Sequence, residues 1–325
     1  MKPRDSLGRI AMKLLCTLLG IVLAVMLGGT LLFRHYLNQI QYTEPQDSSD
    51  SNILSVFSAI PLGSMTEDRI GGPGSNLLNI LLIGQDAREG DEQARSDSMI
   101  LCSYNKKTST LTMTSFLRDL YVEIPGHGSN RINAAYSFGG TALLKKTLEH
   151  NFGLYIDGSL EVDFGNFSEI INHLGGVEIQ LRQDEANTIN KQTGSSLSEG
   201  LQRLDGLQAL TYSRIRNLDI DGDFSRTDRQ RKVMNALVDA FREIRITELT
   251  PLLNDLLPMI TTDLNPGQIL FCALEIFPNL SAMETVSQRI PADGTATDQT
   301  IDGMSVLVAD MAAQRRHLRN TLLGE

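Results

Sequence analysis

The chain has 325 residues, a formal net charge of -10, and hydrophobic side chains at 41% of its positions. This length and apolar content suit one large folded domain or two small ones. The first 34 residues carry five basic side chains and one acidic one, which leaves 24 basic against 38 acidic residues in the remainder. A general nucleic-acid binder needs a broad basic surface, so this acidic remainder excludes that class of protein.

A run of twenty uncharged residues from Leu14 to Phe33 predicts a transmembrane helix, because a helix of that length spans about 30 Å. The basic residues before it place the N-terminus, residues 1–13, in the cytoplasm. Residues 34–75 then form a linker, and residues 76–325 form an extracytoplasmic domain. A cleaved signal peptide is the alternative, but the run is long and lacks a small-x-small cleavage site, which favours an uncleaved anchor.

Strand and helix patterns alternate along the rest of the chain. The expected strands are Leu77 to Ile83, Met99 to Tyr104, Thr110 to Phe116 and Val177 to Gln180. The expected helices are Thr141 to Asn151, Phe167 to Leu174, 226–244, and most of Leu249 to Met283. This alternation predicts an α/β fold, a three-layer α-β-α domain with a central mixed sheet, preceded by the membrane helix.

Two arginine-rich segments carry the first functional signal. Tyr212 to Arg216 reads as a strand, in which Arg214 and Arg216 point to the same side. In the helix that follows, three polar residues share the stripe that should be buried, namely Arg226, Arg229 and Gln230. Like charges that converge on a partly dry surface need an anion between them, and the arginine fork matches phosphate oxygens.

The alternative is a structural network of ion pairs. Four nearby carboxylates could neutralise these arginines without any ligand: Asp219, Asp221, Asp223 and Asp228. The segment alone does not separate the two interpretations.

Further candidate residues follow the predicted strands, where open α/β sheets bind their ligands. Asp86 and Arg88 follow the first strand, and Arg95 and Asp97 precede the second. Two carboxylates beside phosphate-binding arginines suggest Mg²⁺. The third strand is followed by Arg118 and Asp119, and a Gly-rich turn leads to Arg131. Guanidinium groups therefore recur at one end of the sheet in an otherwise acidic domain.

An ordered series of motifs resembles the LytR-CpsA-Psr (LCP) family, most strongly over residues 80–237. The motifs are GQDAR, RSD, SFLRD, RINAAYSFGG, a VDF segment, LGGVEI, LDGLQALTYSRIR and GDFSRTDRQ. Each is weak by itself, but eight in order are specific. The resemblance implies a membrane-anchored enzyme that transfers a glycopolymer from a polyprenyl pyrophosphate carrier to peptidoglycan through a phosphodiester bond.

The resemblance also implies roles for individual residues. Asp86 and Asp97 match the positions associated with Mg²⁺ (or Mn²⁺). The positions that hold the pyrophosphate are matched by Arg95, Arg118, Arg214, Arg216 and Arg229. Arg131 replaces the lysine more usual there, which keeps the charge but changes the geometry toward phosphate. We expect Arg88, Arg226, Gln230 and Asp119 to contribute to substrate binding.

Several points stay open. The general base is one of Asp86, Asp119 and Asp223, and the apolar residues of 143–171 and 233–283 either line a groove for the lipid tail or form ordinary core. Cys102 and Cys272 either form a disulfide or stay as free thiols. A polyprenyl pyrophosphate hydrolase or carrier-binding protein is an alternative function, and a membrane-tethered regulatory or wall-binding module is another. The sequence does not identify the glycopolymer or the oligomeric state.

Overall fold

The computed structural model of the chain describes residues 29, 31–43, 69–85, 96–219 and 223–324. Most of the expected membrane segment and linker therefore lies outside the described residues. Residues 31–37 form a short helix. Among the described helices, none is both long enough and apolar enough to cross a bilayer.

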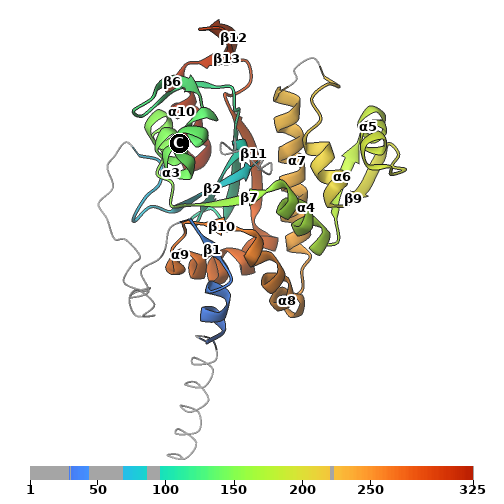
Figure 1. The fold of residues 1–325 in the computed structure, drawn as a ribbon. Helices are drawn as coiled ribbons and strands as arrows, with labels where there is room; N and C mark the ends of the chain where they lie inside the picture. The colour runs from blue at the N-terminus through green and yellow to red at the C-terminus, as the bar shows by residue number, and fades with distance from the viewer. Residues whose placement is uncertain (1–28, 30, 44–68, 86–95, 220–222, 325) are drawn as a thin grey trace, which may run out of the picture.

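A mixed seven-stranded sheet forms the centre of the molecule (Figure 1). Its strands are, in spatial order, β1 (Gln41–Tyr42), β10 (Thr261–Thr262), β7 (Gly158–Asp163), β2 (Leu77–Gln85), β3 (Ser96–Asn105), β4 (Thr110–Phe116) and β11 (Glu284–Ile290). The β2, β3 and β4 strands form an antiparallel meander, whereas β7 is parallel to β2 and β11 is parallel to β4. The prediction of an α/β domain with a central mixed sheet is confirmed.

Helices cover both faces of this sheet. The described helices are α3 (Ala134–Phe152), α4 (Phe164–His173), α5 (Gln183–Thr193), α6 (Gly206–Ser213), α7 (Asp223–Arg242), α8 (Ile246–Leu256), α9 (Pro266–Phe271) and α10 (Met311–Leu323). Short 3-10 and π-helical segments η2 (Leu257–Met259), η3 (Cys272–Ile276) and η4 (Phe277–Ala282) connect the later elements. Three two-stranded antiparallel sheets complete the fold: β5 (Tyr121–Ile124) with β6 (Gly128–Arg131), β8 (Val177–Leu181) with β9 (Gly200–Leu204), and β12 (Ala296–Ile301) with β13 (Met304–Ala309).

The alternation of side chains along β2 explains the layers. Leu81 and Ile83 point into one core, where they pack with α3 and α10. Leu78 points to the opposite face, where the packing partners come from α7 and η3. Because both faces of β2 are covered, its sequence reads as a nearly continuous apolar run.

A lobe beside the sheet carries the α4, α5 and α6 helices and the two-stranded β8–β9 sheet (Figure 1). Its core includes Ile171, Ile179, Leu204 and Tyr212, all buried, and it also receives Val233 from α7. The α7 helix therefore joins the lobe to the sheet.

The expected strand from Tyr212 to Arg216 is wrong. The α6 helix runs through Tyr212 and ends at Ser213. The cause is a capping box at its start, in which the Asp205 side chain accepts a hydrogen bond from the backbone of Gln208 and the Gln208 side chain bonds back. Arg214 and Arg216 consequently lie in the connection after a helix.

Two expected helices differ in detail from the observed elements. The α3 helix begins seven residues before the predicted start and contains a kink at Gly139 and Gly140, where Gly140 has φ of 60°. Between Leu249 and Met283 the expected helical content is interrupted by β10, which pairs with β7 and β1. The prolines and turn residues of this region allow a short strand between helical pieces.

Candidate functional site

Four strands of the main sheet end at the same edge. The β2, β4, β7 and β11 strands run in one direction, and β3 runs oppositely between β2 and β4. The carboxyl ends of four strands and the amino end of β3 therefore meet there. In open α/β sheets this is the edge at which ligands bind.

The two aspartates that are expected to bind metal occur at this edge in the sequence: one follows the last residue of β2, and the other is the second residue of β3. Gln85 and Ser96 are paired in the sheet, and Asp86 and Asp97 are the residues that follow them in sequence. Asp86, Arg88 and Arg95 lie outside the described residues, and of Asp97 only the backbone, in β3, is described. Within the described part of the chain, no cluster of three or more His, Cys, Asp or Glu side chains could hold a metal ion.

A first group of charges lies just beyond β4. The Asp119 carboxylate is 3.7 Å from the Arg118 guanidinium and 3.5 Å from that of Arg131. Arg131 also donates two hydrogen bonds, of 2.9 and 2.7 Å, to the backbone carbonyl of Ser305. The structure thus brings together Arg118, Asp119 and Arg131, which are predicted site residues from two separate motifs.

A second group surrounds Arg229 on α7. Its guanidinium is buried and donates to Glu185 at 2.9 Å, to the carbonyl of Ile215 at 3.2 Å, and to Asp219. Arg182 also donates to Asp219, at 2.9 Å, and these two arginines hold the pKa of the Asp219 carboxyl below its usual value. Arg229 is therefore held by protein partners on three sides, as the ion-pair alternative expects of it.

The geometry of this second group indicates what Arg229 does for its neighbours. Its hydrogen bond to the Ile215 carbonyl fixes the backbone midway between Arg214 and Arg216, whose side chains are exposed. The buried network thus positions the segment that carries two predicted phosphate ligands.

Arg214 lies beside an apolar cavity. Its guanidinium carbon is 4.7 Å from the centre of the Phe164 ring. Phe164 lines a cavity of about 310 Å³ between the sheet and the α4, α6 and α7 helices. Ser213 and Gln230 line the same cavity, and apolar side chains such as Leu82, Val162, Met234 and Phe241 line most of the rest.

This cavity separates the predicted groove residues from ordinary core. From the range 143–171, Leu160, Val162, Phe164, Phe167 and Ile170 line it, whereas Leu144, Leu148 and Phe152 are buried in the core under α3. From 233–283, the residues of α7 that face the sheet line it. The structure therefore divides these apolar residues into a subset that lines the cavity and a subset that forms the core under α3, and a lipid groove stays a prediction for the first subset.

The first two turns of α7 position the remaining predicted residues. Arg226 and Arg229 are buried, at 2% and 3% exposed, as the helical stripe predicts. Gln230 lies one turn after Arg226 and reaches the cavity. Asp223 begins the helix, and its side chain is outside the described part of the structure.

Two further residues at the same edge are absent from the sequence-based prediction. Arg289, at the end of β11, lies 3.0 Å from Asp228 and has its guanidinium 4.8 Å from the centre of the Phe224 ring. Glu161, on β7, is buried and accepts hydrogen bonds from Gln85, Thr141 and, at 2.9 Å, Tyr136. The sequence does not show that Arg289 and Glu161 lie at this edge, because strands from distant parts of the chain bring them there. For Arg289, its position at the end of a strand could have marked it as a candidate.

The thiol question is also answered. Cys102 and Cys272 are free, and burial raises the pKa of Cys102 to about 12 and that of Cys272 to about 11. Both thiols are therefore protonated at neutral pH.

These features define a class of protein: an α/β domain with guanidinium groups at the carboxyl edge of its sheet, next to an apolar cavity. The family comparison agrees, because the LytR_cpsA_psr family model matches residues 59–321. The chain belongs to this family.

Named relatives are similar over part of their length. The chain is 34% identical to the polyisoprenyl-teichoic acid–peptidoglycan teichoic acid transferase TagT of Bacillus subtilis (strain 168), across 66% of this chain and 67% of TagT. It is 39% identical to the corresponding TagU of Oceanobacillus iheyensis, across 59% of this chain and 60% of TagU. It is also 39% identical to the regulatory protein MsrR of Staphylococcus aureus (strain COL), across 52% of this chain and only about half (51%) of MsrR.

Solved structures have the same fold. TagT bound to LI-WTA superposes with a TM-score of 0.64 at 29% identity, covering 80% of this chain and 97% of TagT. The family protein YwtF (TagT) with bound octaprenyl pyrophosphate lipid superposes with a TM-score of 0.60 at 28% identity, with the same coverage.

Proposed function

We propose that this protein transfers a glycopolymer, together with one phosphate, from a polyprenyl pyrophosphate carrier to a sugar hydroxyl of peptidoglycan. The single observation that carries the proposal is the position of Arg214 over Phe164, at the cavity wall. A cation beside an apolar cavity suits a ligand with an anionic head and a long hydrocarbon tail. The names of TagT and TagU, and the lipid bound to TagT, support the same class of substrate.

The chemistry follows from phosphoryl transfer, in which positioning and charge neutralisation supply most of the catalysis. The acceptor hydroxyl oxygen forms a bond to the phosphorus that carries the glycan. The bond from that phosphorus to the bridging oxygen breaks, and polyprenyl phosphate leaves with the electron pair. The hydroxyl proton passes to a base, for which Asp86, Asp119 and Asp223 are the candidates.

Guanidinium groups at the edge would stabilise the charge that grows on the leaving phosphate. At about 4 Å and an effective dielectric near 20, each one interacts with a phosphate charge by roughly 4 kcal/mol before desolvation. Arg95, Arg118, Arg214 and Arg216 are the proposed ligands of the pyrophosphate. Arg229 contributes by holding the segment of Arg214 and Arg216.

Asp86 and Asp97 would hold Mg²⁺ or Mn²⁺, which would neutralise phosphate oxygens when bound. The pairing of Gln85 with Ser96 supports this, because these two residues directly precede Asp86 and Asp97 and lie opposite each other on adjacent strands. The Ser96 hydroxyl is buried and has no hydrogen-bond partner among the described residues, so the neighbourhood can accept a further polar group.

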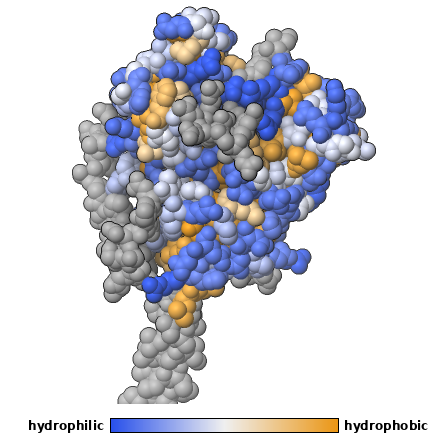
Figure 2. All heavy atoms as spheres, viewed as in Figure 1, coloured by the Kyte–Doolittle hydropathy of each residue, from blue (hydrophilic) through white to orange (hydrophobic). Residues whose placement is uncertain are grey.

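The domain would work outside the cell, held by one N-terminal helix with its amino end in the cytoplasm. The uncharged run from Leu14 to Phe33 supports this. Leu31 and Leu32 are 60% and 49% exposed. Figure 2 shows hydrophobic residues at this lower end of the molecule, and further hydrophobic patches among the hydrophilic residues of the visible face.

Transfer is tested with a carrier whose glycan-linked phosphorus is radiolabelled, incubated with the protein and peptidoglycan strands. The label should appear in peptidoglycan, and unlabelled polyprenyl phosphate should be released. A hydrolase would instead release labelled glycan phosphate into solution, and a carrier-binding protein would leave the carrier intact.

The name of MsrR favours one second candidate, a regulatory module in which the arginines only dock an anion. That function does not need the metal carboxylates. Loss of transfer in Asp97→Asn, with carrier binding retained, would support the transferase over the regulator, and full function in Asp97→Asn would support the regulator.

A further inference from the structure

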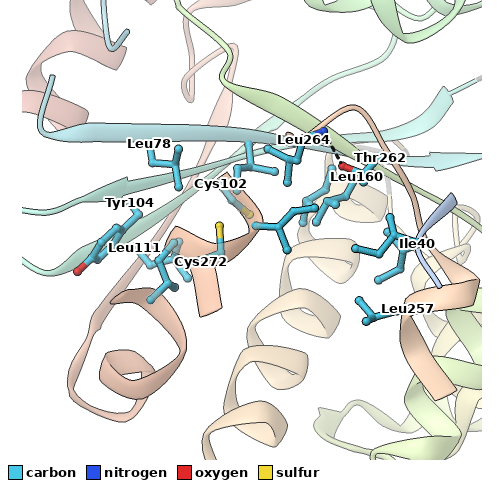
Figure 3. Close-up of a pocket in the computed structure, with 15 residues that line it drawn as sticks. Ile40, Leu78, Cys102, Tyr104, Leu111, Leu160, Leu257, Thr262, Leu264 and Cys272 are labelled. Atoms are coloured by element: carbon cyan, nitrogen blue, oxygen red, sulfur yellow. Dashed lines mark hydrogen bonds between the residues drawn. The ribbon is translucent and has the colours of Figure 1, made fainter. Parts of the chain in front are cut away.

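A buried carboxylate lies near the carboxyl edge of the sheet, on the face opposite the apolar cavities. Leu160 of β7 lines the first cavity and a second apolar cavity beside it (Figure 3). Successive side chains of a strand point to opposite faces, so Glu161, the next residue of β7, points toward α3. Glu161 is only 6% exposed. It is therefore too enclosed to meet a substrate directly.

Three hydrogen-bond donors converge on the Glu161 carboxylate. One of its oxygens accepts from the hydroxyl of Thr141. The other accepts from the side-chain amide of Gln85 and, at 2.9 Å, from the hydroxyl of Tyr136. Burial and the charge of Glu161 raise the pKa of Tyr136 above its usual value, so this hydroxyl keeps its proton and donates it. Burial of a carboxylate is costly, and the three neutral donors offset that cost and fix its orientation.

The three donors come from two elements that carry site motifs. Gln85 is the last residue of β2, and Asp86 follows it in the sequence. Tyr136 and Thr141 lie before and after the kink in α3. Glu161 therefore ties the end of β2 to both parts of α3.

The backbone of Glu161 is held inside the sheet. It pairs with Ile83 of β2 on one side and with Thr261 of β10 on the other. The carboxylate is thus a fixed point to which the side chain of Gln85, at the end of its strand, is bonded. Groups that orient a metal-binding carboxylate from behind typically change metal affinity or activity by about 10- to 100-fold when they are substituted.

We propose that Glu161 is a positioning residue of the transfer reaction: by holding Gln85 at the end of β2, it sets the place of Asp86 relative to Asp97 on the neighbouring strand. This inference rests on the proposed function, in which Asp86 and Asp97 hold a divalent cation. Glu161 acts through its hydrogen bond to Gln85, and it neither binds the cation nor accepts the substrate proton.

Gln85→Met tests this tie from its other end. The substitution removes the amide, keeps the length of the side chain, and leaves Glu161 bonded to Tyr136 and Thr141. The full chain in phosphatidylcholine nanodiscs is compared with the wild type by three measurements. These are Mn²⁺ binding from the electron paramagnetic resonance of the free ion, the transfer rate at saturating carrier and acceptor, and the dissociation constant of octaprenyl pyrophosphate without metal. The relevant Mn²⁺ site is the one that Asp97→Asn abolishes.

We expect Gln85→Met to lower Mn²⁺ affinity and the transfer rate by about tenfold each. Binding of octaprenyl pyrophosphate should change less than about twofold, because the arginines are untouched. The matched control is Asp157→Asn, since Asp157 accepts a hydrogen bond of 2.8 Å from the backbone of Asn79, near the amino end of β2. This control should change neither Mn²⁺ affinity nor the transfer rate.

Substitutions of Glu161 itself separate its hydrogen bond from its charge. Glu161→Met removes the acceptor and should reproduce the losses of Gln85→Met, and the double variant should be no worse than Glu161→Met alone, because both remove the same contact. Glu161→Gln keeps an oxygen for Gln85, and its amide can donate to a hydroxyl, so it should retain Mn²⁺ affinity and rate within roughly threefold.

Wild-type Mn²⁺ affinity and rate in a folded Gln85→Met protein would overturn the positioning role and leave the proposed function intact. A Glu161→Gln protein as impaired as Gln85→Met would also overturn it, because the charge would then matter and not the hydrogen bond. A wild-type protein that transfers without binding Mn²⁺ through Asp97 would refute the positioning role alone. If the wild type transfers nothing, the proposed function fails and the positioning role fails with it.

Discussion

At the scale of single residues, Arg214 joins the two halves of the site. Its neighbours, Phe164 in the apolar wall and Arg216 in the same segment, place it between tail and head of the expected carrier. The sequence shows the arginine, but the contact with Phe164 depends on the packing of α4 against the connection after α6. That packing has no local sequence signal.

We expect Arg214→Ala to lower the rate of transfer by about 100-fold or more, because one preorganised cationic donor is removed from the developing charge. Steady-state transfer of labelled glycan to peptidoglycan measures the rate. The matched control is Arg203→Ala, since Arg203 is an exposed arginine of β9 that pairs with Glu178. A rate in Arg214→Ala equal to that of Arg203→Ala would argue against a role for Arg214.

The contact between Glu185 and Arg229 could not be predicted from the sequence. The helical stripe correctly predicts that Arg229 is buried, but its partner lies 44 positions earlier in another helix. Both side chains are almost completely buried, at 3% and 2% exposed. Such a pair is costly to break because the remaining charge stays out of water.

We predict that Glu185→Gln lowers the free energy of unfolding by about 3 kcal/mol, since Arg229 then keeps only part of its neutralising charge. Urea unfolding followed by circular dichroism measures this free energy. The neighbouring Asp184→Asn, at an exposed side chain, should change it by less than about 0.5 kcal/mol. If Glu185→Gln and Asp184→Asn lower the free energy of unfolding equally, the buried ion pair does not stabilise the fold more than an exposed one does.

At the scale of elements, the strands with strong local patterns were predictable and the junctions were not. The strand from Thr110 to Phe116 is confirmed with its predicted bounds, and the run after Leu77 is a central strand. The segment around Tyr212 alternates as a strand does, but the capping box of Asp205 and Gln208 starts a helix that runs through it.

The contact of α6 with α4 is the junction on which the first cavity depends. At Gly206, the first residue of α6, an added Cβ would lie 2.0 Å from the backbone carbonyl oxygen of Ser168 in α4. Phe167 of α4 and Leu210 of α6 both line the cavity, so any separation of these helices changes its wall.

Gly206→Ala should therefore lower the free energy of unfolding by about 1–3 kcal/mol, because the backbones must move apart. The sign of this change in the free energy of unfolding is informative, since alanine in a helix normally adds up to about 1 kcal/mol of stability over glycine. Thermal and urea unfolding measure the change. Leu207→Ala, at an exposed neighbouring position, serves as the control, and a stabilised Gly206→Ala protein would show that the close approach is absent.

At the scale of the whole molecule, a cationic edge borders an apolar cavity on one face of the sheet. The order of motifs predicted the family and the class of substrate. The cavities could not be predicted, because they result from the register of β2, β3 and β7 and from helices that approach the sheet from distant parts of the chain. Their apolar residues have the same local pattern as ordinary core.

The most direct test of the central claim is mass spectrometry of lipids extracted from the purified full chain after incubation with octaprenyl pyrophosphate. The account predicts that the wild-type protein retains this lipid in about equimolar amount. It also predicts that Arg214→Ala and the cavity-filling Met234→Trp each lose most of it, since head and tail contacts are both required. Equal retention by all three proteins, or none by the wild type, would contradict a single amphipathic site.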